Sequence, residues 1–161
     1  MNLYTQEELD RIKKCSEKNQ AMEDFFQTRM NEWNGKINPL FDVLKEKLTS
    51  PDCIMENQAL ALSYKQIIME QISLFLSKRS KEDTHLKRLK QDKFVLYAVA
   101  SPLKTNTGEK IMLIEGHIAE NQRTLELIEN HIEFLRSCSK NLDSFSYAIK
   151  NIIDLMNYLG R

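Results

Sequence analysis

The last third of the chain carries a seven-residue repeat of apolar side chains that is sustained over seven heptads. With heptad position a set at Ile111 and the last d position at Met156, eleven of the fourteen a and d positions are apolar. The other three are polar: Asn121, Ser139 and Ser146. A 3.5-residue period held over this length is typical of a helix that packs along a seam, as in a coiled coil. The pattern predicts one long helix over residues 111–156.

The flanks of this seam change along the helix. All e positions, from Glu115 to Asn157, are polar. The g positions are polar in the first three heptads and apolar from Cys138 onward. A stripe that widens in this way can contact two neighbouring helices. We therefore expect the helix to associate with copies of itself in a bundle or ring, through these oligomerisation residues: Ile118, Leu125, Ile128, Ile132, Leu135, Leu142, Ile149, Ile153 and Met156. The alternative is that it packs on the chain's own third helix, expected over residues 52–93, as in an antiparallel hairpin.

Glycine and proline are scarce in the whole chain. Four glycines and three prolines in 161 residues leave few turns for a many-stranded sheet, so we expect an all-α fold of long helices. Thr5 and Glu8 have the spacing of a capping box, in which each side chain accepts a hydrogen bond from the other residue's backbone N–H. This pair predicts the start of the first helix.

The few turn signals divide the rest of the chain. Gly35, which follows an asparagine, predicts the end of the first helix, and Pro39 behind an asparagine predicts a short second helix over about residues 38–48. Pro51 behind a serine has the same arrangement at the head of a third helix. That helix can run over residues 52–93, because this stretch contains neither glycine nor proline.

The segment between the two long helices allows two interpretations. Residues 94–100 and 110–114 are largely apolar, and between them lie a proline and an Asn-Thr-Gly turn signal. This arrangement fits a short β-hairpin near residues 94–114, or the end of one helix and the start of the next. The strongly helical flanks favour the helical turn.

Charge and cysteine content narrow the function classes. The formal net charge is zero, so any attraction to nucleic acid must come from local clustering. Three well-separated single cysteines and an acidic N-terminus without signal-peptide order favour the cytoplasm, and no apolar run is long enough to span a membrane. Neither a catalytic motif nor a metal-binding spacing is present, and the three histidines are isolated, so we expect no enzyme, no cofactor and no metal.

A basic stretch over residues 77–93 is the clearest local charge cluster. It carries seven lysines and arginines against three acidic residues. On a helix these cations form a slowly turning stripe that can lie along a phosphate backbone, with Phe94 and Tyr97 placed to stack on bases. The predicted DNA-binding residues are Lys87, Arg88, Lys90 and Lys93. The alternative is a solvated helix face with internal ion pairs.

The order of features over residues 44–161 resembles the UvsY family of recombination mediators, which is known from T-even phages. Residues 59–64 (ALALSY), followed by a lysine-rich helix with LKQDK at residues 89–93, are similar to that family's central helix and its DNA-contacting basic pair. Residues 109–115 (EKIMLIE) and 147–154 (YAIKNIID) are similar to the start and end of its C-terminal region. The second basic position of the pair falls on Asp92, with Lys93 next to it.

The resemblance implies a non-enzymatic mediator that forms a homo-oligomer, binds single-stranded DNA, displaces single-strand-binding protein and loads a RecA-like recombinase. It also implies two regions, an N-terminal helical extension over residues 1–43 without a counterpart in the family and a DNA-binding and oligomerisation domain over residues 44–161. If the protein is phage-encoded, it would act in the cytoplasm of an infected bacterial host. The alternative function is a structural or scaffolding helical-bundle protein that binds other proteins and not DNA.

Overall fold

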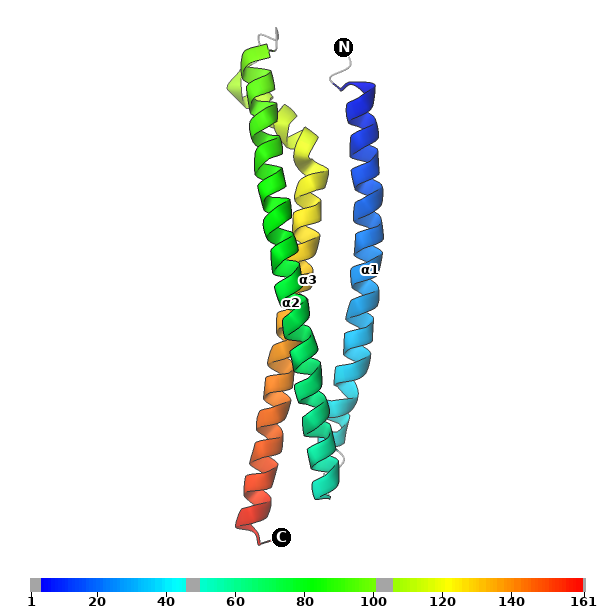
Figure 1. Cartoon of the computed structure of the whole chain (residues 1–161), viewed down its shortest axis with the longest axis vertical. Coiled ribbons are helices and arrows are strands. Elements are labelled where there is room, and N and C mark those ends of the chain that lie inside the picture. The colour runs from blue at the N-terminus through cyan, green and yellow to red at the C-terminus, as the bar shows by residue number, and fades with distance from the viewer. Residues whose placement is uncertain (1–3, 46–49, 101–105, 161) are drawn as a thin grey trace. The chain divides into compact units, whose positions relative to one another are not determined.

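The computed structural model describes residues 4–45, 50–100 and 106–160, which form three long helices (Figure 1). These are α1 (Gln6–Lys45), α2 (Pro51–Val95) and α3 (Thr107–Tyr158), and a five-residue π-helix, η1 (Leu96–Ala100), continues α2. All regular structure in these three stretches is helical, so the expected all-α fold is confirmed. Residues 94–100 and 107–114 lie in helices, which agrees with the helical interpretation of this segment and not with the hairpin.

Side-chain caps fix the start of each helix. Thr5 and Glu8 form the expected capping box: the Thr5 backbone N–H donates to Glu8 Oε2 at 2.9 Å, and the Glu8 N–H donates to Thr5 Oγ1 at 3.2 Å. At the head of α2 the Cys53 N–H donates to Ser50 Oγ at 3.2 Å. Asn106 and Glu109 repeat the reciprocal pair at the head of α3. Each cap satisfies N–H groups that have no partner within the helix.

The predicted break in the first helix is wrong. α1 continues through Gly35 and Pro39, so the expected short helix over residues 38–48 does not exist as a separate element in its described part. A proline inside a helix costs about 3 kcal/mol, because it removes one backbone hydrogen bond and crowds the preceding turn. Trp33, Ile37 and Leu40 are each at most 3% exposed, and burying such side chains contributes roughly 1.5–3 kcal/mol apiece, which offsets that cost.

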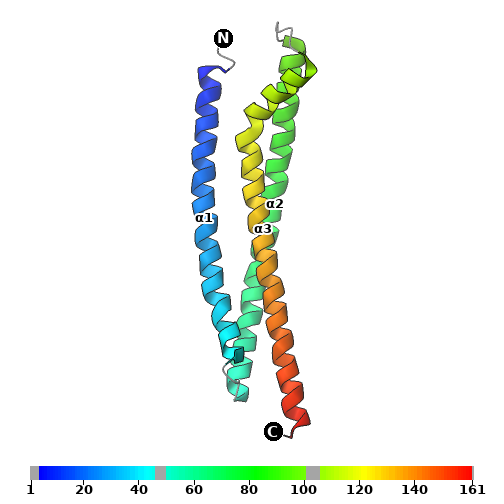
Figure 2. The ribbon, with the colours of Figure 1, turned by 180° about the vertical axis from the view of Figure 1, so that it is seen from behind.

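The three helices, which Figure 2 shows from behind, contribute to two compact units, each built from one segment of every helix. Unit 1 comprises residues 1–25 and 76–130, and unit 2 comprises residues 26–75 and 131–161. α1 therefore contributes to both units. The expected regions over residues 1–43 and 44–161 stay a prediction.

Unit 2 has a contiguous apolar core. Its buried residues come from all three helices: Trp33, Ile37 and Leu40 of α1, Ile54, Ala61, Ile68 and Ile72 of α2, and Leu135, Cys138, Leu142, Phe145 and Ile149 of α3. Aromatic side chains add edge-to-face contacts, such as that of Phe41 with Phe145 at 5.9 Å between ring centroids. The apolar core of unit 1 is smaller and is centred on Leu89, Ile114 and Ile118.

The heptad seam of α3 lies within these units. Of the nine expected oligomerisation residues, six are buried and three are half-buried: Ile118, Ile128, Ile132, Leu135, Leu142 and Ile149 are buried, and Leu125, Ile153 and Met156 are half-buried. The g positions from His117 to Phe145 are buried as well. The widened stripe thus contacts two neighbouring helices, and these are α1 and α2 of the same chain. The contact with α2 is the packing that the sequence offered as the alternative to self-association, and the contact with α1 was not expected.

Candidate functional site: basic stripes and a polar pocket in unit 1

The four predicted DNA-binding residues do not share one face of α2. Lys87, Arg88 and Lys90 are exposed, whereas Lys93 is buried. Successive residues of an α-helix are rotated by about 100°, so Arg88 and Lys90 point roughly 160° apart around the axis. The exposed cations of α2 therefore form two separate stripes, one on each side of the buried face.

The first of these, the lysine–aromatic stripe, consists of Lys87, Lys90 and Phe94 at helical spacings of three and four residues. Lys90 has no carboxylate partner among the described residues, and Lys87 forms an exposed ion pair with Asp83 at 2.7 Å. Such pairs contribute little and exchange readily with other anions. Phe94 is 57% exposed, which is unusual for a phenylalanine ring.

Phe94 also lines a hollow of about 200 Å³ at the junction of η1 with α3. The surface of the hollow is mostly apolar, and Lys110 is its one basic lining residue in the described part of the chain. It is lined by Phe94, Tyr97, Ala98, Thr107, Lys110, Ile111 and Ile114. The lysine–aromatic stripe therefore leads from two exposed ammonium groups to an aromatic surface beside a third.

Lys93 has a different role. It is 8% exposed, and its Nζ forms an ion pair with Glu8 Oε1 at 2.5 Å. The hydrogen bond from Lys93 and one from the Thr5 backbone lower the pKa of Glu8 to about 2. Since each charge neutralises the other inside unit 1, Lys93 is not available to a phosphate in this arrangement.

His117 completes this buried polar cluster. Its Nε2 is hydrogen-bonded to the hydroxyl of Tyr97, and its Nδ1 lies 3.9 Å from Glu8 Oε1 without a hydrogen-bond partner among the described residues. Burial, together with the nearby Lys93 charge, lowers the pKa of His117. Burial also raises the pKa of Tyr97. Tyr97 is thus held in the cluster, and of the two expected stacking residues only Phe94 is exposed.

The second stripe, the lysine–arginine stripe, consists of Lys78, Lys81, His85 and Arg88, all exposed and spaced by three or four residues. None of its three cations has a carboxylate partner among the described residues, whereas the neighbouring Arg79 pairs with Glu129 at 2.7 Å. Five residues of α2 border a shallow hollow of about 260 Å³: Ser80, Lys81, Thr84, His85 and Arg88. Of these three cations only Arg88 was among the predicted DNA-binding residues, although the spacing of all three already indicates a common face.

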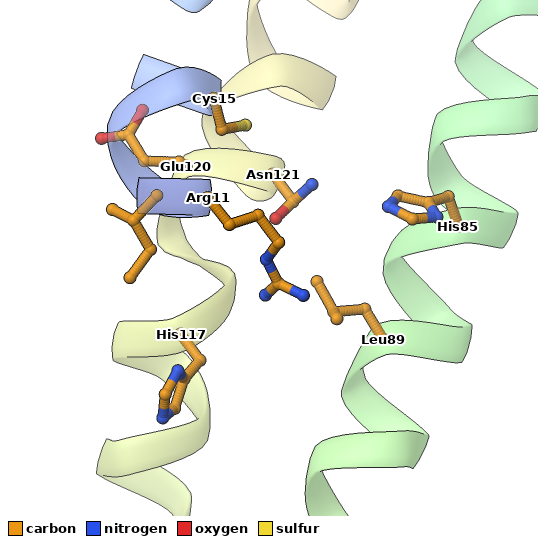
Figure 3. Close-up of a pocket in the computed structure, with 8 residues that line it drawn as sticks. Arg11, Cys15, His85, Leu89, His117, Glu120 and Asn121 are labelled. Carbon is orange, nitrogen blue, oxygen red and sulfur yellow. The ribbon is translucent and has the colours of Figure 1, made fainter. Parts of the chain in front are cut away.

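A pocket of about 170 Å³ lies on the inner side of His85 (Figure 3). Most of its lining surface is apolar, and we call it the polar pocket after the polar side chains of Arg11, His85 and Asn121. All three helices line it: Arg11, Ile12 and Cys15 of α1, His85 and Leu89 of α2, and His117, Glu120 and Asn121 of α3. In Figure 3 the His85 ring extends from α2 toward Arg11 and Asn121. Sequence reasoning missed this pocket, because its polar side chains come from three distant segments without a common motif.

A second buried histidine lies in the core of unit 2. His131 is 2% exposed and stacks on Phe26 with ring centroids 4.2 Å apart, and burial lowers its pKa to about 4. The unfolded chain, with a histidine pKa near 6.5, binds this proton between pH 6.5 and 4, while the folded chain does not. Stability is therefore complete above pH 6.5 and falls as the pH drops through this window.

We expect His131→Phe to remove this part of the pH dependence. His131 should account for a loss of unfolding free energy on the order of 3 kcal/mol between pH 7 and pH 4. Urea unfolding of the wild type and the variant at both pH values, followed by circular dichroism, measures it. Equal losses of stability in the two proteins would contradict the assignment.

The described residues contain no group of three or more potential metal ligands, and no helix among them is long and apolar enough to cross a membrane. No protein-family model, curated protein or solved structure matches the chain. The resemblance to the UvsY family therefore stays a prediction.

Proposed function

We propose that this protein binds single-stranded DNA without catalysing a reaction, as a recombination mediator does. The observation that carries the proposal is the lysine–aromatic stripe. Proteins that bind single strands combine cations that follow the phosphates with aromatic rings on which bases stack. Lys87 and Lys90 supply the first element, and Phe94 with the adjoining hollow supplies the second.

The stripe suits a flexible single strand better than a duplex. Lys87 and Phe94 are seven residues apart, which spans roughly 10 Å along a helix. A base can reach the Phe94 ring only if it is unstacked from its neighbours, as bases of a single strand are. No set of side chains here is arranged to read base edges in a groove, so we expect binding without sequence preference.

Phosphate affinity of one such stripe is modest, and a mediator that acts on a long strand gains from several linked copies. The proposed role is to hold the strand while single-strand-binding protein leaves and a RecA-like recombinase is loaded. Since the heptad seam is covered within the chain, association of copies would use other surfaces. Three apolar side chains of α2 are exposed at seven-residue spacing for this purpose: Met55, Leu62 and Met69.

The test is fluorescence anisotropy with a labelled oligo-dT strand at several salt concentrations. Lys90→Ala should lower the slope of log affinity against log salt by about 0.7, the value for one phosphate contact on a single strand. Phe94→Ala should weaken binding by roughly fivefold or more, because base–aromatic stacking is worth about 1–3 kcal/mol per base.

Lys140→Ala is the matched control, because it removes the same charge from an exposed position of α3 in unit 2. It should leave the affinity within about twofold, as expected for a long-range effect that salt screens. Lack of binding at low salt, or equal effects of Lys90→Ala and Lys140→Ala, would overturn the proposal.

A second candidate function is a scaffold that binds other helices and not DNA. It is favoured by the row of Met55, Leu62 and Met69, which are 68%, 56% and 47% exposed. Apolar side chains at heptad spacing on an exposed face fit a second copy of this chain laid along α2. Oligomers in sedimentation experiments, combined with no affinity for oligo-dT, would select this candidate over the mediator.

A further inference from the structure

We infer that the polar pocket between Arg11, His85 and Asn121 is a binding site for a phosphate group. The site lies apart from the lysine–aromatic stripe, and it does not depend on the proposed function. The argument starts from the polar side chains that line the pocket without partners of their own.

Three polar side chains meet at this pocket, one from each helix: Arg11 of α1, His85 of α2 and Asn121 of α3. None of the three side chains has a hydrogen-bond or ion-pair partner in the part of the chain that the structure describes; Arg11 and His85 are exposed, and Asn121 is half-buried. Arg11 offers a fork of N–H groups, His85 a ring N–H and Asn121 an amide N–H. Donors that have no acceptor from the protein within hydrogen-bond distance favour a ligand that brings oxygen atoms.

A buried group supports the same conclusion. His117 lines the pocket, is 1% exposed, and has a buried Nδ1 with no hydrogen-bond partner among the described residues. Buried polar atoms of this kind nearly always have a partner. The nearest acceptor is Glu8 Oε1 at 3.9 Å, whose charge Lys93 neutralises, so an oxygen atom bound in the pocket would give Nδ1 the partner that it lacks. A neutral imidazole can donate one hydrogen bond to an oxygen atom in the pocket.

The carboxylate among the lining residues does not oppose an anion strongly. Glu120 Oε2 accepts a hydrogen bond from Asn19 Nδ2 at 3.0 Å, and Figure 3 shows the carboxylate turned away from Arg11. Positive charge instead extends beyond the pocket, because His85 also borders the shallow hollow of Lys81 and Arg88. This second cationic zone favours a doubly charged phosphate over a singly charged carboxylate.

The size of the pocket limits the ligand. A volume of about 170 Å³ holds a phosphate group with a few water molecules but not a nucleoside. The phosphate could belong to a free small molecule or to the 5′ end of a DNA strand. The shared chemistry is a terminal phosphate, and the experiment can separate the two sources.

The experiment is a titration of the full chain with inorganic phosphate, followed by ¹H–¹⁵N NMR of the arginine side chains and the backbone at constant ionic strength. We expect saturable shifts at Arg11, His85 and Asn121, and affinity for acetate at least about fivefold weaker. Arg11→Gln should weaken phosphate binding by about tenfold or more, since hydrogen bonds to charged groups are worth about 1.5–3 kcal/mol. Lys13→Gln, an exposed change on the same helix, should have little effect.

A second arm compares 5′-phosphorylated oligo-dT with its 5′-hydroxyl counterpart. If the 5′-phosphate strengthens binding in the wild type but not in Arg11→Gln, the pocket binds the end of a DNA strand. If both oligo-dT strands bind equally well while inorganic phosphate still causes saturable shifts, the ligand is a free phosphate compound. No saturable shift with inorganic phosphate, or equal effects of Arg11→Gln and Lys13→Gln, would overturn the site. The effect of Lys90→Ala on the salt dependence of oligo-dT binding is independent of this result, so the two proposals can fail separately.

Discussion

Replacing Lys93 by methionine should destabilise the protein by roughly 2–3 kcal/mol. Methionine keeps much of the apolar stem of the side chain but removes the ammonium group that pairs with Glu8. The Glu8 carboxylate, which is only 20% exposed, would then lie without its counter-charge beside His117. Urea unfolding followed by circular dichroism at neutral pH measures the loss.

Two further variants make this prediction specific. Glu8→Gln combined with Lys93→Met should recover part of the lost stability, since no unpaired charge then remains in the cluster. Lys90→Ala, which changes an exposed lysine on the same helix, should alter stability by less than about 0.5 kcal/mol. If Lys93→Met stays fully stable but loses affinity for oligo-dT, then Lys93 contacts DNA and the buried pair does not represent the protein in solution.

Leu142→Ala should cost about 2–5 kcal/mol of unfolding free energy, the usual range for a leucine removed from a closely packed core. Leu142 is 1% exposed and lies in the core of unit 2 with residues of α1 and α2. Because these contacts lie within one chain, the loss should not change with protein concentration. Chemical unfolding at a low micromolar protein concentration and at a concentration about 100 times higher measures the stability loss and its dependence on concentration.

Leu155→Ala is the matched control, since it makes the same change on the same helix at a side chain that is 57% exposed. Its effect on stability should be within about 0.5 kcal/mol. A stability loss in Leu142→Ala that shrinks as the concentration rises would show that the seam joins copies of the chain, as the heptad pattern first suggested.

The parts of the fold that depend on neighbouring residues were predictable from the sequence. The Thr5–Glu8 cap, the Ser50 cap and the long helix over residues 111–156 follow from spacings of three to seven residues. The same local reasoning was wrong at Gly35 and Pro39, because the burial of Trp33, Ile37 and Leu40 depends on distant segments.

The candidate sites were less predictable for the same physical reason. Lys93 looked like its exposed neighbours, and only the fold reveals its pairing with Glu8, 85 residues away. The polar pocket brings Arg11, His85 and Asn121 together from three helices, and no single-sequence pattern connects them. A heptad pattern also indicates only that a seam is covered; it does not distinguish a helix of the same chain from one of another copy.

The way in which the two units are assembled limits how the protein can be shortened. Each unit takes its helices from two stretches that are separate in the sequence, and the boundaries at residues 25/26, 75/76 and 130/131 all fall inside helices. No single cut produces a fragment that consists of one unit alone, because any fragment with one whole unit also carries part of the other. A truncation that removes residues 1–43 would take one helix from both units, so deletion mapping would report loss of folding wherever the functional residues lie.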